Sequence, residues 1–135
     1  MKLFLKLLLF LGCLAFISQS SLAQSRVAFR IDMRQQMKDS VFVPSQHQIV
    51  IEGNELPFTQ LNSFEMEELR QSDSVFVKEI RFPRRSQDKV LEYRYVIKRP
   101  QIDDIEESRF RLLNLSSDIN RPKILNIAYF NNFPR

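Results

Sequence analysis

The sequence predicts an all-β fold, a single antiparallel β-sandwich of the immunoglobulin-like type with six to eight strands. Several short segments alternate apolar and polar residues, and turn-forming residues separate these segments. No long segment has the 3.6-residue apolar spacing of a helix. The chain also contains many Phe, Val, Ile and Tyr residues, which favour strands.

Residues 1–23 precede this domain and have the pattern of a signal peptide. Lys2 and Lys6 come before an apolar run at 7–17, which is too short to span a bilayer, and small residues then lead to Ala23. We expect cleavage after Ala23 and export to the periplasm or the extracellular space.

Lipidation at Cys13 is the alternative, and it would anchor the protein to a membrane. Phe10 and Leu11 fit a lipidation motif poorly, and the apolar run continues beyond Cys13, so simple cleavage is preferred. Cys13 is the one cysteine of the chain, so residues 24–135 contain no disulfide.

Residues 24–135 have the usual length of one domain. Loss of Lys2 and Lys6 reduces the formal net charge of +4 by two. The small positive charge that remains does not predict binding to nucleic acid. No second apolar segment predicts a membrane span.

The first predicted strands are residues 27–33, with strict alternation, and residues 48–52, which end at the turn signal Gly53-Asn54. Residues 63–69 are mixed and predict either a helical turn or an irregular edge. Residues 74–82 alternate again until Pro83, and residues 84–88 predict a polar hairpin loop.

Residues 89–98 have the clearest strand pattern, and Pro100 ends it. In that segment Tyr93 and Tyr95 share the apolar face of the alternation, so we expect both in the core. The last two predicted strands are residues 109–115 and 124–130. Tyr129 and Phe130 fall on opposite faces of the final strand, so one of them should be exposed.

The composition excludes several classes of chemistry. One glycine, Gly53, remains after the leader, whereas phosphate-binding loops need several. One histidine, His47, and no cysteine cannot form a structural zinc site, and no serine lies in a nucleophile-elbow context. We therefore predict no catalytic residues, no cofactor and no metal; a small hydrolase with paired carboxylates is the surviving enzyme alternative. We expect His47 at the surface.

The acidic residues at 103–107 have two interpretations. Four carboxylates close together resemble an all-oxygen calcium site. Charged runs are usually solvated, however, and this run follows Pro100. A solvent-exposed loop is the preferred interpretation.

The order of motifs resembles the starch-binding-domain-like β-sandwiches of bacterial secreted proteins. The resemblance covers nearly all of residues 24–135. The motifs that carry it are Phe29-Arg30-Ile31-Asp32-Met33, Phe42-Val43-Pro44, Ile49-Val50-Ile51-Glu52-Gly53-Asn54 with Pro57-Phe58, Val75-Phe76-Val77, Leu91-Glu92-Tyr93-Arg94-Tyr95-Val96-Ile97 and Tyr129-Phe130-Asn131-Asn132. The resemblance implies a non-catalytic module that holds α-glucans.

The resemblance also implies a sugar site of two tryptophans and a lysine. The lysine position falls on Arg94, and the tryptophan positions fall near Gln60 and at Ile105, which precedes Glu106. Both aromatic platforms are therefore replaced, while a charged donor remains. The simpler interpretation of Arg94 is an exposed strand residue paired with Glu92 or Glu79.

Two functions follow from these expectations. The first is an exported module that binds a polysaccharide through residues near Arg94. The second is a structural or interaction domain that binds an envelope protein and has lost sugar recognition. An exposed aromatic strip near Arg94 would favour the first, and a flat apolar patch or a free edge strand would favour the second.

Overall fold

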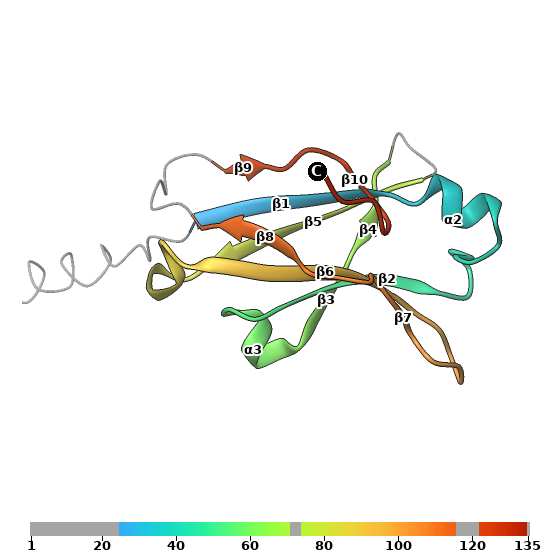
Figure 1. Ribbon diagram of the computed structural model, residues 1–135, viewed down its shortest axis with the longest axis horizontal. Helices are drawn as coiled ribbons and strands as arrows, with labels where there is room; N and C mark the ends of the chain where they lie inside the picture. The colour runs from blue at the N-terminus through green and yellow to red at the C-terminus, as the bar shows by residue number, and fades with distance from the viewer. Residues whose placement is uncertain (1–24, 71–73, 116–121, 135) are drawn as a thin grey trace, which may run out of the picture.

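The chain folds into two β-sheets packed face to face, as the computed structural model shows (Figure 1). The structure describes residues 25–70, 74–115 and 122–134. Residues 1–24, which contain the predicted leader and its cleavage site, lie outside these ranges. The predicted sandwich is confirmed, with ten strands in the described residues instead of six to eight.

The first sheet has the order β10-β1-β5-β4, and β9 also pairs with β1. β1 and β5 are antiparallel along their full lengths, whereas β9 and β10 run parallel to β1. The antiparallel prediction therefore fails at this edge, because the chain returns from the second sheet in the same direction as β1. The strands are β1 (Ser25–Asp32), β4 (Glu67–Glu68), β5 (Val75–Phe82), β9 (Lys123–Ile124) and β10 (Ala128–Tyr129).

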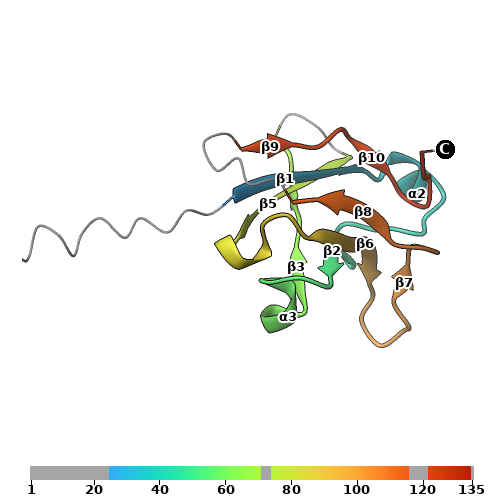
Figure 2. The same ribbon diagram turned by 60° about the vertical axis from the view of Figure 1, so that its left-hand side comes forward.

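The second sheet has the order β3-β2-β6-β7, and β8 pairs with the same edge of β6 as β7 does. Its centre is the antiparallel pair of β2 and β6. Figure 2 shows this sheet below the first. The strands are β2 (Gln48–Gly53), β3 (Ser63–Glu65), β6 (Val90–Lys98), β7 (Ile105–Glu106) and β8 (Arg111–Asn114).

Three short helical segments interrupt the strands, and the sequence pattern did not predict them. They are α2 (Arg34–Lys38), α3 (Phe58–Leu61) and the 3-10 turn η1 (Arg84–Ser86), which lies in the predicted polar loop. Each is five residues or shorter, too short to show a helical period. No helix in the described residues has the length and apolar character that crossing a membrane requires.

The core lies between the sheets and consists mainly of the inward residues of the alternating strands, with Phe42 and Phe58 added from the connecting segments. Phe29 of β1 contacts Tyr93 of β6 edge-on, with ring centroids 5.0 Å apart, so that the two sheets interlock through aromatic rings. Tyr93 and Tyr95 are buried, as predicted, with exposures of 7% and 1%. Of the last aromatic pair, Phe130 is buried and Tyr129 is the exposed member.

Candidate functional site

Arg94 lies on the outer face of the second sheet, in the middle of β6. The β2–β6 register places it opposite Glu52, and its Nε is 3.5 Å from a Glu52 carboxylate oxygen. A terminal nitrogen of Arg94 is 3.1 Å from a carboxylate oxygen of Glu106 on β7. Arg94 is thus paired, as the simpler interpretation expected, but with Glu52 and Glu106 instead of Glu92 or Glu79.

Lys98 extends this charged row along β6. Its Nζ lies 2.7 Å from an Asp104 oxygen and 3.8 Å from a Glu52 oxygen. The hydrogen bond to Asp104 is the main reason that the pKa of Lys98 is raised above its ordinary value. We call the set of Glu52, Arg94, Lys98, Asp104 and Glu106 the charged cluster.

An aromatic ring flanks the charged cluster. The Arg94 guanidinium carbon lies 4.6 Å from the centre of the Phe110 ring, within cation–π range. Phe110 is 47% exposed, so much of the ring remains open to solvent. Leu112 on β8 and Val90 on β6 are also exposed large apolar residues, and the β6–β8 register places them opposite Glu92 and Asn114, respectively.

The structure brings together two of the four predicted ligand-binding residues, Arg94 and Glu106. Ile105 is half-buried and packs against the core, so it cannot replace an exposed aromatic platform. Gln60 is exposed on α3, which packs beside β2 and β3. Because β2 and β6 lie between β3 and β7, Gln60 lies near the opposite edge of the sheet from Glu106.

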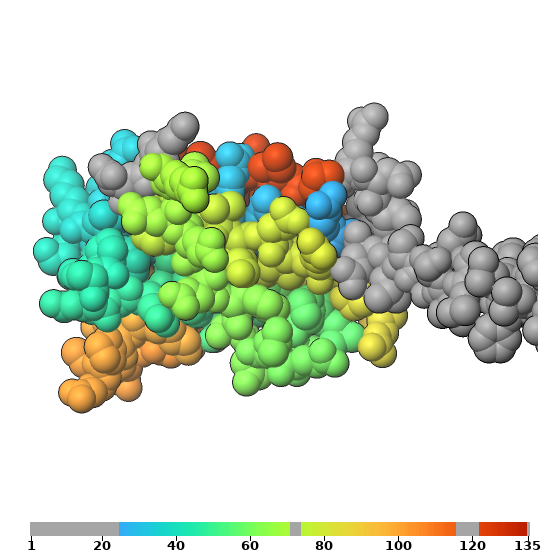
Figure 3. Space-filling model, turned by 180° about the vertical axis from the view of Figure 1, so that it is seen from behind, coloured from blue at the N-terminus to red at the C-terminus, as the bar shows by residue number. Residues whose placement is uncertain are grey.

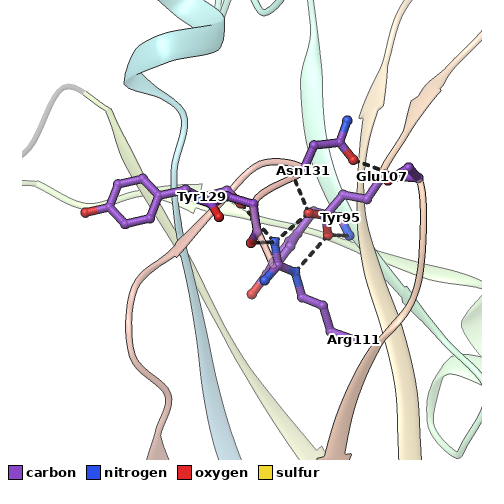
Figure 4. Close-up of polar contacts among 7 residues, drawn as sticks. Tyr95, Glu107, Arg111, Tyr129 and Asn131 are labelled. Atoms are coloured by element: carbon purple, nitrogen blue, oxygen red, sulfur yellow. Dashed lines mark hydrogen bonds and ion pairs between the residues drawn. The ribbon is translucent and has the colours of Figure 1, made fainter. Parts of the chain in front are cut away.

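A second cluster, which the sequence did not predict, lies inside the sandwich where β7 ends (Figure 4). The Glu107 side chain is fully buried, and that of Arg111 is 10% exposed. Arg111 donates two hydrogen bonds to Glu107, 3.0 Å and 2.6 Å long. Burial lowers the pKa of Arg111, but the hydrogen bonds and charge of Glu107 more than compensate, so the pKa is raised and the guanidinium stays charged.

The Glu107 carboxylate also joins three segments of backbone. One oxygen accepts the N–H of Tyr95 on β6, and the other accepts the N–H of Asn131 after β10. Arg111 in turn donates to the carbonyl oxygens of Tyr129 and Asn132. We call Glu107 and Arg111 the buried pair; it holds the C-terminal segment against the second sheet.

The hydrogen bonds of the buried pair position the backbone around it. Each Glu107 oxygen accepts two hydrogen bonds, so the carboxylate has no free capacity and no access to solvent. The pair instead fixes the segment from which the exposed Tyr129 ring extends, away from the polar contacts in Figure 4.

The interpretation of the acidic run as a solvated loop is wrong for one of its members. Asp103, Asp104 and Glu106 are exposed, whereas Glu107 is 2% exposed as a whole residue. In the described residues no group of three or more acidic, histidine or cysteine side chains has the arrangement that could hold a metal ion.

The sequence contained one signal for the buried pair. Arg111 falls on the same side of the strand alternation as the buried Leu113 and Leu115, where an arginine is out of place unless it has a partner. Glu107 stands four residues before it.

A further contact joins two arginines to Phe133. The guanidinium carbons of Arg109 and Arg111 lie 4.3 Å and 4.7 Å from the centre of the Phe133 ring, and no strand pattern predicts that contact.

Comparison with known proteins supports the fold. No protein-family model matches the chain, and no curated protein matches it. Among solved structures, the gamma-CGTase from alkalophilic Bacillus clarkii matches with a TM-score of 0.58 and 16% sequence identity. The match covers 81% of this chain and 15% of that one, so the chain resembles a small part of the larger protein. At this identity the likeness shows a shared fold.

Proposed function

We propose that this chain is an exported, non-catalytic binding module that holds a carbohydrate on the outer face of its second sheet. The observation that carries the proposal is the exposed Phe110 ring 4.6 Å from Arg94, which is itself held between Glu52 and Glu106. An aromatic face packs on the apolar face of a sugar ring, and planar charged groups beside it hydrogen-bond the hydroxyls.

Phe110 would supply the stacking surface that the sequence lacks at Gln60 and Ile105. It reaches the neighbourhood of Arg94 from the turn between β7 and β8, and not from the positions that the family resemblance indicates. A single exposed platform without tryptophan predicts weak binding to an isolated sugar unit, so a polymer is the preferred ligand class. The resemblance to starch-binding domains makes α-glucans the first polymers to test.

The absence of catalysis is part of the proposal, and the pairing of the carboxylates supports it. Glu52, Asp104 and Glu106 each lie within 4 Å of Arg94 or Lys98, and Glu107 is saturated with hydrogen bonds. These four carboxylates are thus already engaged in ion pairs or hydrogen bonds within the protein.

Isothermal titration tests the proposal. The full chain is expressed, the exported product is purified, and soluble starch, glycogen and, separately, envelope polysaccharides are titrated into it. Saturable binding is expected, and Phe110→Ala and Arg94→Ala should each weaken it by about tenfold or more. Tyr129→Ala is the matched control, because Tyr129 is an equally exposed aromatic on the first sheet and should change the affinity by less than about twofold.

A folded product that binds none of these polysaccharides would overturn the proposal. The alternative is an envelope protein as partner, which the exposure of Leu112 (69%) on β8 and Val90 (48%) on the adjacent strand β6 favours. In that case Leu112→Asp would abolish co-purification of a partner from envelope extracts, whereas a carbohydrate module would lose little affinity from this substitution.

A further inference from the structure

One end of the sandwich carries a group of arginines. Arg26 lies at the start of β1 and Arg81 near the end of β5, and the antiparallel register places these two residues directly opposite each other. The chain then forms η1, which contains Arg84 and Arg85. Figure 1 shows that β1 begins, β5 ends and the yellow η1 lies at the same end of the molecule, whereas α2 lies at the other end. We call Arg26, Arg81, Arg84 and Arg85 the arginine group.

All four arginines are exposed to solvent. Arg26 and Arg81 alternate with buried core residues along their strands, so they lie on the outer face of the first sheet. Figure 3 shows the blue residues of β1 beside the yellow residues of β5 on this face of the molecule. Arg84 and Arg85 belong to the connection from β5 in the first sheet to β6 in the second. The arginine group therefore extends from the outer face onto the end of the sandwich.

Few carboxylates balance these cations. A nitrogen of Arg26 lies 3.7 Å from a Glu79 oxygen, and the two side chains are 45% and 47% exposed. Among the described residues, none of the other three arginines forms an ion pair with a carboxylate. Asp88 in the same connection is exposed, and Lys89 beside it is paired with Glu55. Four guanidinium groups against the carboxylates of Glu79 and Asp88 leave this end with an excess of positive charge.

The placement of Arg26 opposite Arg81 is unfavourable by itself, because like charges directly opposite each other destabilise a pair of strands. Arg30 on the same face of β1 is placed differently, since it donates two hydrogen bonds to the carbonyl of Leu125. An anion beside Arg26 and Arg81 would replace their repulsion by attraction to both guanidinium groups. The arrangement therefore favours a negatively charged ligand.

The residue types restrict the class of that ligand. A guanidinium group is planar and hydrogen-bonds a carboxylate, sulfate or phosphate through two N–H groups at once. Because the arginine group extends over two strands and a turn, a polymer with several anionic groups can contact all of it. A surface that enters a lipid bilayer combines basic residues with exposed Trp, Phe or Leu. Of the described elements that carry the group, β1, β5 and η1 have no exposed residue of this kind, so a hydrated polymer is preferred to a membrane.

We propose that the arginine group binds an acidic polysaccharide, with the anionic groups of successive sugar units on successive guanidinium groups. This surface is separate from the proposed carbohydrate site, because the charged cluster lies on the outer face of the second sheet. Recognition also differs: here the charge of the polymer is recognised, whereas Phe110 would stack on an uncharged sugar ring.

Isothermal titration of the exported product with dextran sulfate and with dextran tests this proposal. The two polymers share one backbone, so the sulfate groups are the difference between them. Dextran sulfate should bind at least about tenfold more tightly at about 50 mM salt, because several exposed charge pairs act together. In the relation that holds for single-stranded nucleic acids, which are also linear polyanions, four contacts predict about a fiftyfold loss of affinity between about 50 and 200 mM salt.

The double variant Arg84→Gln, Arg85→Gln removes two contacts. The loss of affinity for dextran sulfate over the same range of salt should fall to about sevenfold, and the affinity at about 50 mM salt should fall by about tenfold. The matched control is Arg34→Gln, Lys38→Gln, which removes the same charge from two exposed residues of α2 at the other end of the molecule. It should change the affinity by less than about twofold.

Three results would overturn the proposal. The first is equal affinity for dextran and dextran sulfate, and the second is an equal loss of affinity in the two double variants. The third is binding to phosphatidylglycerol vesicles without binding to dextran sulfate, which would indicate a membrane surface. The variant Phe110→Ala should leave the binding of dextran sulfate unchanged, so the outcome is distinguishable from failure of the carbohydrate site on the second sheet.

Discussion

At the scale of single residues, the contrast between Glu106 and Glu107 is the clearest lesson of the structure. Both are glutamates paired with an arginine, but Glu106 is 48% exposed and Glu107 is fully buried. Exposed ion pairs contribute little to stability, whereas removing one member of a buried pair leaves an uncompensated charge in the interior.

We predict that Glu107→Gln lowers the free energy of unfolding by about 3 kcal/mol, because Arg111 is left charged and buried. Chemical denaturation followed by circular dichroism measures the change. Glu106→Gln is the control and should cost less than about 1 kcal/mol. Adding Arg111→Met to Glu107→Gln should restore part of the loss; equal costs for the two glutamate variants would contradict the role assigned to the buried pair.

The buried tyrosines Tyr93 and Tyr95 determine how we expect the stability of the fold to change at alkaline pH. Burial is the main reason that the pKa of Tyr95 is raised well above its ordinary value, and the pKa of Tyr93 is raised for the same reason. A group whose pKa is higher in the folded state stabilises the fold below its unfolded pKa, and that contribution is lost as the pH rises through the folded value.

We therefore predict that the melting temperature is steady near neutral pH and falls above about pH 10. Thermal melts over a series of pH values, with tyrosinate absorbance as a second readout, measure this fall. Tyr95→Phe should make the alkaline decline shallower without removing it, since Tyr93 and Lys98 also have raised pKa values. An unchanged alkaline decline in this variant would show that Tyr95 is not its main cause.

For single residues, the sequence predicted the burial of side chains that follow the strand alternation. It missed contacts between residues that come from different strands and turns. Tyr93 and Tyr95 were predicted in the core because they share the pattern of Leu91 and Ile97. Phe110 could not be placed beside Arg94, since that contact depends on the turn between β7 and β8. Gln60, which the family resemblance indicated as a tryptophan position, lies on α3 beside β2 and β3, whereas Glu106 lies at the other edge of the sheet.

At the scale of elements, long alternating segments were predicted closely and short ones were not. The expected strand at 89–98 is β6 (Val90–Lys98), and the expected strand at 74–82 is β5. The expected strand at 109–115 begins only at Arg111, and that at 124–130 divides into β9 and β10. Strands of two residues have no period to detect, so tertiary pairing alone defines them.

Gly53, at the end of β2, offers a test of how an element packs. Its φ is not positive, so the backbone alone does not require glycine. A Cβ at this position would lie 2.7 Å from a ring carbon of the buried Phe58 in α3, closer than two carbons can approach. The requirement for glycine is therefore one of space.

We predict that Gly53→Ala lowers the free energy of unfolding by about 1–3 kcal/mol, as overpacking in a filled core usually does. A double-mutant cycle with Phe58→Leu, measured by chemical denaturation, checks the cause. The combined loss should be smaller than the sum of the two single losses, because the smaller side chain relieves the contact. Additive losses would show that Phe58 is not the group that excludes a larger residue.

At the scale of the whole molecule, the sandwich followed from the alternation, and the function did not. An apolar face on every strand is sufficient to predict two packed sheets, because each sheet must bury one side. The proposed carbohydrate site would depend on a few exposed groups from the turn at 108–110 and from strands β2, β6 and β7. The topology brings these groups together. The order of motifs indicated that topology only through the resemblance to starch-binding-domain-like β-sandwiches.

The predicted export of this molecule has a direct consequence for its stability. If the leader is removed after Ala23, the product contains no cysteine and must rely on the packed core alone. We predict that intact-mass measurement of the exported product shows a chain that begins at Gln24, and that its melting temperature is the same with and without a reducing agent. A product that begins at a lipid-modified Cys13 would instead show a membrane anchor, and a melting temperature sensitive to reduction would show that Cys13 is retained in a disulfide between chains.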